Sequence, residues 1–89
     1  MPRLFFTPQL ARFTATPELD SAATTLGEAL QGAFDINPQL RGYVLDDQGH
    51  LRANVVAFID GQRCRDRVAL SDPLLMDSRV HVLQALSGG

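Results

Sequence analysis

A single amphipathic helix is the feature that most restricts the folds open to this chain. Thr25 and Glu28 form a capping box, in which the two side chains satisfy free backbone N–H groups at the helix start. An apolar stripe follows at helical spacing through Leu26, Ala29, Leu30, Ala33 and Phe34. Pro38 disfavours helical geometry in the residue before it, so the helix should end near Ile36. Its two glycines each cost about 1 kcal/mol relative to alanine, so this helix needs a sheet to pack against.

Short apolar runs on both sides of the helix are typical of β-strands. These runs are 4–7, a weaker one at 17–21, 43–45 leading into a turn at 46–49, 54–59 and 80–85. Asp60-Gly61 favours a tight hairpin turn with positive φ, and residues 71–74 indicate a turn or short helical loop. Alternation in the last run places Val80 and Val82 in the core. The element order predicts an α+β domain with one main helix packed across a mixed sheet of four or five strands.

The composition is that of one globular domain, which we expect at residues 1–86, before a flexible tail at 87–89. The 89 residues are 45% apolar and 20% charged, enough for one modest core. The longest apolar run, 55–59, is far shorter than the roughly 20 residues of a membrane span. A net charge of −2 without a basic stripe argues against binding to nucleic acid. One cysteine, Cys64, and no cleavable signal indicate the cytoplasm.

The sequence ends in Ser87-Gly88-Gly89, which suits a protein whose own carboxyl terminus reacts. Glycine has no Cβ, so such a tail can pass through a narrow enzyme channel in conformations closed to other residues. Chance produces two terminal glycines in roughly one chain in 200. The pair therefore indicates a reactive terminus only in combination with the kind of domain that precedes it. All eight basic residues are arginine. Genomic base composition is the simpler reason, but a chain without lysine also has no side-chain amine to attack its own activated terminus.

Several segments, in this order, resemble the small ubiquitin-like sulfur carriers, which include the small subunit of molybdopterin synthase and the thiamine sulfur carrier (MoaD/ThiS-like proteins). The similar segments cover essentially the whole chain and are 4–6, 25–30, 51–61, 73–74 and 80–89. The resemblance implies a β-grasp, or ubiquitin-like, fold. Two departures lie near the surface that docks partners in this family. Asp77-Ser78-Arg79 replaces a common Asp-Gly-Asp, and Leu83-Gln84-Ala85 replaces the proline before the tail.

The resemblance implies that Gly89 is the reactive residue, with Gly88 and Ser87 giving access to it. An adenylating enzyme of the ubiquitin-activating type would use ATP and Mg²⁺ to convert its carboxylate into an acyl-adenylate. A persulfide sulfur donor would displace AMP and leave a thiocarboxylate. A sulfur-accepting synthase subunit would then use that sulfur in cofactor biosynthesis. The chain would be a carrier that binds no cofactor. Its length and acidic turn favour the molybdopterin type over the thiamine or cysteine type.

The predicted docking surface combines exposed apolar residues next to the tail with a basic rim. Its candidate partner-binding residues are Phe6, His81, Leu83 and Arg67. Phe6 belongs either to this surface or to the core. Arg63, Arg65 and Arg67 alternate along a predicted strand and would share one face, either as a solvated edge or as a rim for an acidic partner.

Two other functions are open to a chain with these residues. A ubiquitin-like modifier or protein-binding module would use the same fold, with a tail that is conjugated to amines or inert. A free-standing enzyme would depend on Cys64, His50 or His81, but these match no metal-ligand spacing. His50 more simply caps a turn and His81 lies on an exposed strand face. The sequence therefore predicts no metal site.

Overall fold

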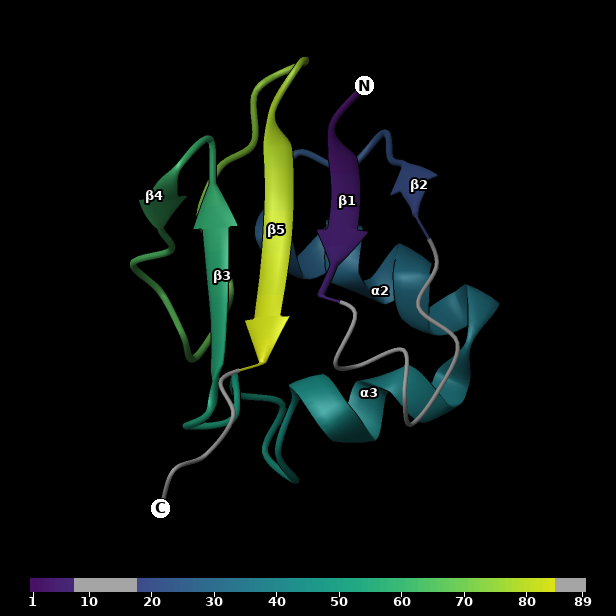
Figure 1. Ribbon diagram of the computed structural model, residues 1–89, viewed down its shortest axis with the longest axis vertical. Helices are drawn as coiled ribbons and strands as arrows, with labels where there is room; N and C mark the ends of the chain where they lie inside the picture. Colours follow the sequence, from purple (N-terminus) through teal and green to yellow (C-terminus); the bar gives the residue numbers. More distant parts are fainter. Residues whose placement is uncertain (8–17, 85–89) are drawn as a thin grey trace.

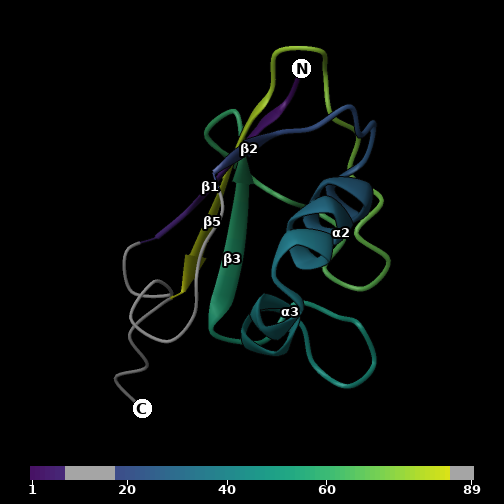
Figure 2. The ribbon, with the colours of Figure 1, turned by 90° about the vertical axis from the view of Figure 1, so that its right-hand side faces the viewer.

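The chain forms a mixed five-stranded sheet with two helices on one face (Figures 1 and 2), in a computed structural model that describes residues 1–7 and 18–84. The strands are β1 (Arg3–Phe6), β2 (Leu19–Asp20), β3 (Val55–Ile59), β4 (Gln62–Arg63) and β5 (Arg79–Gln84), and the helices are α2 (Leu26–Ile36) and α3 (Pro38–Val44). The sheet order is β2-β1-β5-β3-β4. β5 is therefore central, parallel to β1 and antiparallel to β3. The predicted domain end at residue 86 lies outside the described residues.

Helix α2 has the predicted bounds, and its start is stabilised by a distant loop as well as by its cap. The Thr25 Oγ1 accepts a hydrogen bond from the Glu28 N–H at 3.3 Å. The capping box predicts that the Glu28 carboxylate accepts a backbone N–H group at the helix start. It accepts the Thr25 hydroxyl instead, at 3.1 Å. The N–H groups of Leu26 and Gly27 instead donate to the carbonyl oxygens of Asp72 and Leu70, at 3.0 and 2.9 Å. The loop before β5 thus completes the helix N-terminus.

The prediction of a strand at 43–45 is wrong, because these residues form the end of a second helix, α3. Pro38 does end α2, but it also occupies the first turn of α3, where its missing N–H costs nothing. The Asn37 side chain caps this helix by accepting from the Gln39 N–H at 3.2 Å. Leu40 and Val44, four positions apart, are both fully buried. The burial of this helical pair outweighs the β-propensity of a run of only three residues.

The core lies between the sheet and the helices. β5 alternates as predicted, with Val80 and Val82 fully buried and His81 exposed. Leu4 of β1 lies beside Val80 in register and is also fully buried. The hairpin between β3 and β4 is confirmed: Asp60 and Gly61 have φ values of 52° and 85°, as a tight primed turn requires. Neither of the two described helices has the length and apolarity of a membrane span.

The strand predicted through residues 63–67 ends at Arg63, so Arg63, Arg65 and Arg67 do not share a strand face. An acidic side chain folds the chain into a loop instead. The Asp66 carboxylate accepts the Ser71 hydroxyl at 2.5 Å and the Val68 and Ala69 N–H groups at 3.0 and 2.9 Å. These bonds, the hydroxyl first, lower the pKa of Asp66 to about 2.

Candidate functional site

The candidate site is the sheet face turned away from the helices, together with the chain that follows β5. Gln84 pairs with Val55 on one side, and its N–H donates to the Thr7 hydroxyl at 3.4 Å on the other. The predicted reactive residues Ser87, Gly88 and Gly89 lie outside the described residues. The structure does show how the strand before them is held by its neighbours. Gly89 follows Gln84, the last residue of that strand, by five positions.

The face opposite the helices carries an aromatic row across three strands. His81 of β5 is paired in register with Phe5 of β1 and with Phe58 of β3. The rings of Phe5 and His81 stack with centroids 4.8 Å apart and planes at 12°. His81 is exposed as predicted, and both phenylalanines are half-buried. The sequence reasoning missed Phe5 and Phe58, although the alternation in 54–59 could have placed Phe58 opposite the core.

Two further rows flank the aromatic one. Towards the chain end, Leu83 pairs with Val56 and both are half-buried. Away from the chain end, Arg79 pairs with Arg3. The Arg3 guanidinium contacts Glu18 at 2.8 Å and Asp20 at 3.0 Å. The hydrogen bonds that the guanidinium donates to these carboxylates, the one to Glu18 first, raise the pKa of Arg3. The open face is thus apolar next to the end of β5 and charged at its other end.

The structure brings together three of the four predicted partner-binding residues. Phe6, His81 and Leu83 line one hollow of about 180 Å³ between β1 and β5. Phe6 is half-buried and also packs against the core, beside Val82 in register. The core placement considered for Phe6 is therefore supported, and its role in partner binding stays a prediction. We call the surface formed by Phe5, Phe58, Val56, His81 and Leu83 the open-face patch.

Arg67 lies apart from this hollow, in the loop that follows β4. One of its guanidinium nitrogens, Nη2, donates to the Arg52 carbonyl at 2.6 Å, and its own carbonyl accepts from the Leu51 N–H at 2.9 Å. These bonds tie the loop to the segment that leads into β3. A role of Arg67 in partner binding stays a prediction.

Cys64 and His50 are the other two residues that the sequence offers for a catalytic role. Cys64 is half-buried, and its pKa is raised, first by burial and then by the charge of Asp72, which disfavours a reactive thiolate. His50 belongs to a turn in which its backbone N–H donates to the Asp46 carboxylate at 3.0 Å. Among residues 1–7 and 18–84, no cluster of histidine, cysteine or acidic side chains could hold a metal ion.

Solved structures share this arrangement over nearly the whole chain. Small archaeal modifier protein 1 (SAMP1) from Haloferax volcanii superposes with a TM-score of 0.76 at 22% identity, covering 99% of this chain and 98% of that one. SAMP1 from Methanosarcina acetivorans gives 0.79 at 20% identity, with 99% and 95% covered. A chain of the Amycolatopsis orientalis BexX/CysO complex gives 0.82 at 12% identity, with both chains fully covered.

The fold is a ubiquitin-like β-grasp. This confirms the fold predicted from the family resemblance. Searches against family models and curated proteins returned no significant match. At these identities the structural likeness establishes the fold, so the function is argued from the site itself.

Proposed function

We propose that this chain is a sulfur carrier whose reactive group is the carboxylate of Gly89. One observation carries the proposal: in a β-grasp domain, the central strand β5 leads within five residues to a Gly-Gly pair. β5 is held by β1 on one side and β3 on the other, which gives the residues after it a firm base. A carboxylate on two glycines also presents no Cβ to obstruct a partner's active site.

The chemistry needs no catalytic side chain from the carrier. A carboxylate oxygen of Gly89 attacks the α-phosphate of ATP, a P–O bond forms, and pyrophosphate leaves. The terminal sulfur of a persulfide then attacks the acyl carbon and AMP leaves. A thiol cleaves the resulting S–S bond and is itself oxidised to a disulfide, so that the thiocarboxylate remains. Partner enzymes supply the ATP, Mg²⁺ and thiols, and the raised pKa of Cys64 agrees with a carrier that contributes none of them.

The open-face patch provides a docking surface beside the reactive end. Its row of Leu83 and Val56 is the one nearest the end of β5, and the stacked Phe5–His81 pair follows. An apolar centre with charged groups at its edge is the usual composition of a protein interface. The activating enzyme and the sulfur-accepting enzyme must both reach Gly89, so we infer that they occupy this patch one after the other. A synthase of the molybdopterin type is the acceptor we favour.

Intact-mass spectrometry tests the proposal directly. The protein purified from its native source should first show a mass that ends at Gly89. Incubation with an adenylating enzyme of the ubiquitin-activating type, ATP, Mg²⁺ and a persulfide donor should then add about 16 Da, because one oxygen is replaced by sulfur. Deletion of Gly89 is the matched control and should abolish the gain. A gain that survives this deletion, or none with any activating enzyme from the same organism, would contradict the proposal.

Docking has its own test in the same reaction. Leu83→Asp places a charge in the apolar row next to the chain end and should slow thiocarboxylate formation at least about tenfold. Arg41→Gln, on an exposed position of α3, should leave the rate unchanged. Equal rates for both variants would show that the activating enzyme does not use the open-face patch.

A second function, protein modification, is favoured by a specific observation: two of the structural neighbours are named as small archaeal modifier proteins. In that case Gly89 would form an amide bond with an amine on another protein. Conjugates of higher mass that resist reducing agents and vanish on deletion of Gly89 would establish it. This chain has no lysine, so no side chain of a second copy could be the acceptor.

A further inference from the structure

His81 is the one titratable side chain in the open-face patch, and it lies in the middle of the aromatic row. Its ring stacks on Phe5, with centroids 4.8 Å apart and planes at 12°, and Phe58 pairs with it from the other side. Within residues 1–7 and 18–84, neither ring nitrogen takes part in a hydrogen bond or an ion pair. The side chain is exposed. A partner that covers this row therefore takes the imidazole out of water.

Three arginines share the open face with His81. Arg79 precedes it by two positions on β5 and is exposed, and Arg3 pairs with Arg79 from β1. On the other side, Arg63 of β4 pairs with Phe58 and is also exposed. Residues paired across two strands point to the same face of the sheet, so these arginines belong to the face of His81. Like charges nearby disfavour a further positive charge on the imidazole.

The carboxylates on these strands are bound to other groups. Glu18 and Asp20 contact the Arg3 guanidinium at 2.8 and 3.0 Å. Asp60, which follows β3, accepts one hydroxyl and one backbone N–H, each at 2.9 Å. No carboxylate in the described part of the chain forms an ion pair with His81. The fold therefore provides no anion to accompany a protonated imidazole when the open-face patch is covered.

We propose that docking on the open-face patch selects the neutral form of His81, so that protonation of this one side chain weakens docking. The inference rests on the proposed function, in which the activating enzyme occupies this patch. Histidine is the side chain that ordinarily changes charge between pH 5 and 8. Covering a charged imidazole in an apolar row costs more free energy than covering a neutral one, unless the partner supplies an anion. The partner surface over His81 is therefore apolar and carries no carboxylate.

The pH dependence of thiocarboxylate formation tests this inference. With the activating enzyme, ATP, Mg²⁺ and a persulfide donor, kcat/KM for the carrier is measured between pH 5.5 and 8 for wild type and for His81→Phe. Phenylalanine keeps an aromatic ring in the row but cannot titrate. The ratio of wild type to variant cancels the pH dependence of the enzyme. It should fall about tenfold from pH 8 to 5.5, since a histidine one unit below its titration midpoint is only about one-tenth neutral. The midpoint of this fall should match that of the His81 ring signals in NMR spectra of the free carrier, because kcat/KM reports the free reactants.

Two further variants assign the effect to the charge of His81. His50→Gln removes the other histidine, which lies in the turn at 46–49 and its flank, and should keep the wild-type pH profile. His81→Arg carries a permanent charge and should react at least about tenfold more slowly than wild type at pH 8.

The outcomes distinguish this inference from the proposed function. A ratio that does not change with pH would overturn the inference alone, as would a flat profile for His50→Gln. A ratio that rises as the pH falls would also overturn it, because an acidic partner surface would then lie over His81. No thiocarboxylate at any pH with any activating enzyme from the same organism would contradict the proposed function, and this inference with it.

Discussion

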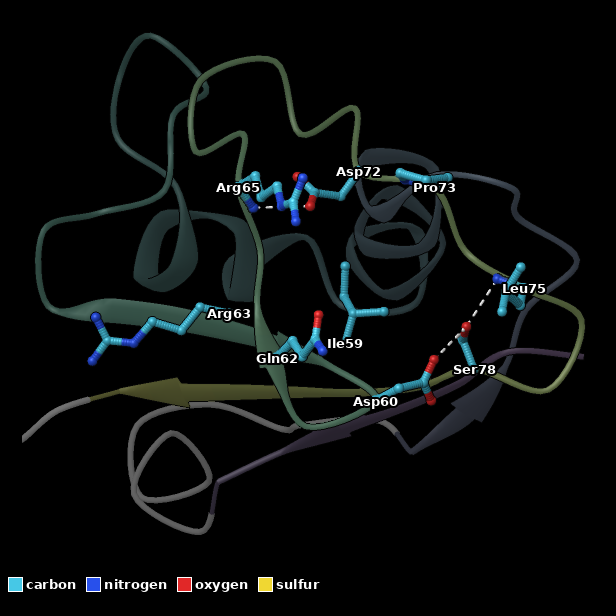
Figure 3. Close-up of a pocket in the computed structure, with 9 residues that line it drawn as sticks. All are labelled: Ile59, Asp60, Gln62, Arg63, Arg65, Asp72, Pro73, Leu75 and Ser78. Atoms are coloured by element: carbon cyan, nitrogen blue, oxygen red, sulfur yellow. Dashed lines mark hydrogen bonds between the residues drawn. The ribbon is translucent and has the colours of Figure 1, made fainter.

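Replacing Ser78 by alanine should destabilise the protein through a single buried hydroxyl. Ser78 is only 1% exposed and is the one buried polar side chain in the described residues. Its hydroxyl oxygen accepts the Leu75 N–H at 2.8 Å and donates to Asp60 Oδ2 at 2.9 Å (Figure 3). It thus joins the chain before β5 to the β3–β4 hairpin. Ser78 stands where the family resemblance leads one to expect glycine, which could form neither bond.

The size of the effect follows from the groups that lose their partner. Ser78→Ala leaves the part-buried Leu75 N–H without an acceptor, which costs about 1–3 kcal/mol. Asp60 is exposed to water, which can replace the lost donor, so its contribution is small. We therefore expect the free energy of unfolding to fall by about 2 kcal/mol. For a domain of this size, the midpoint of thermal unfolding should fall by roughly 8–16 °C.

The effect should also depend on pH. The Arg79 N–H first, and then the Ser78 hydroxyl, lower the pKa of Asp60 from its ordinary value of 3.8. A lowered pKa in the folded state stabilises the protein above the unfolded-state value, and this stability is lost as the pH falls through the folded value. Ser78→Ala removes part of this contribution. The stability difference between wild type and variant should therefore be constant above about pH 5 and shrink below pH 4.

Urea unfolding followed by circular dichroism measures these differences, since the chain has no tryptophan. Ser21→Ala is the matched control, because the Ser21 hydroxyl accepts only one N–H, that of Ala23 at 3.0 Å. It should cost less than about 1 kcal/mol. A stability of Ser78→Ala within about 0.5 kcal/mol of wild type would refute the reasoning from buried hydrogen bonds.

Further predictions concern helix α2 and the loop after β4. Gly32→Ala should raise the free energy of unfolding by about 0.5–1 kcal/mol, because an added Cβ would meet only a methyl group of Leu19, at 3.8 Å. Gly27→Ala should show no such gain in the same urea assay, since its Cβ would lie 3.2 Å from the Leu70 carbonyl oxygen; equal gains would contradict the close contact. Asp66→Asn should lower the free energy of unfolding above pH 4. The difference from wild type should shrink as the pH falls towards the folded pKa of Asp66, about 2. A deficit independent of pH between 2 and 5 would show that the charge of Asp66 does not stabilise the loop.

The elements that could be predicted are those whose signals are local in the chain. Helix α2 was found from a threonine cap, an apolar stripe and a proline, all within about four turns. The turn at Asp60-Gly61 depends on the φ values of two adjacent residues. Helix α3 could not be separated from a strand, because the decisive fact is that Leu40 and Val44 both reach the core. Likewise Arg63, Arg65 and Arg67 alternate in the sequence, but Asp66 folds the chain between them into a loop.

Local patterns were enough to predict the fold class, the core face of β5 and the outward direction of His81 and Leu83, because strand alternation is set by covalent geometry. The residues that lie next to His81 on the open face are set only by the tertiary structure. Phe5 and Phe58 are 53 positions apart in the chain and come into one row with His81 only through the register of three strands. The hollow of about 440 Å³ at the other end of the sheet likewise joins the β3–β4 hairpin to residues before β5. Such non-local pairings depend on how the whole core closes, and no local pattern encodes that.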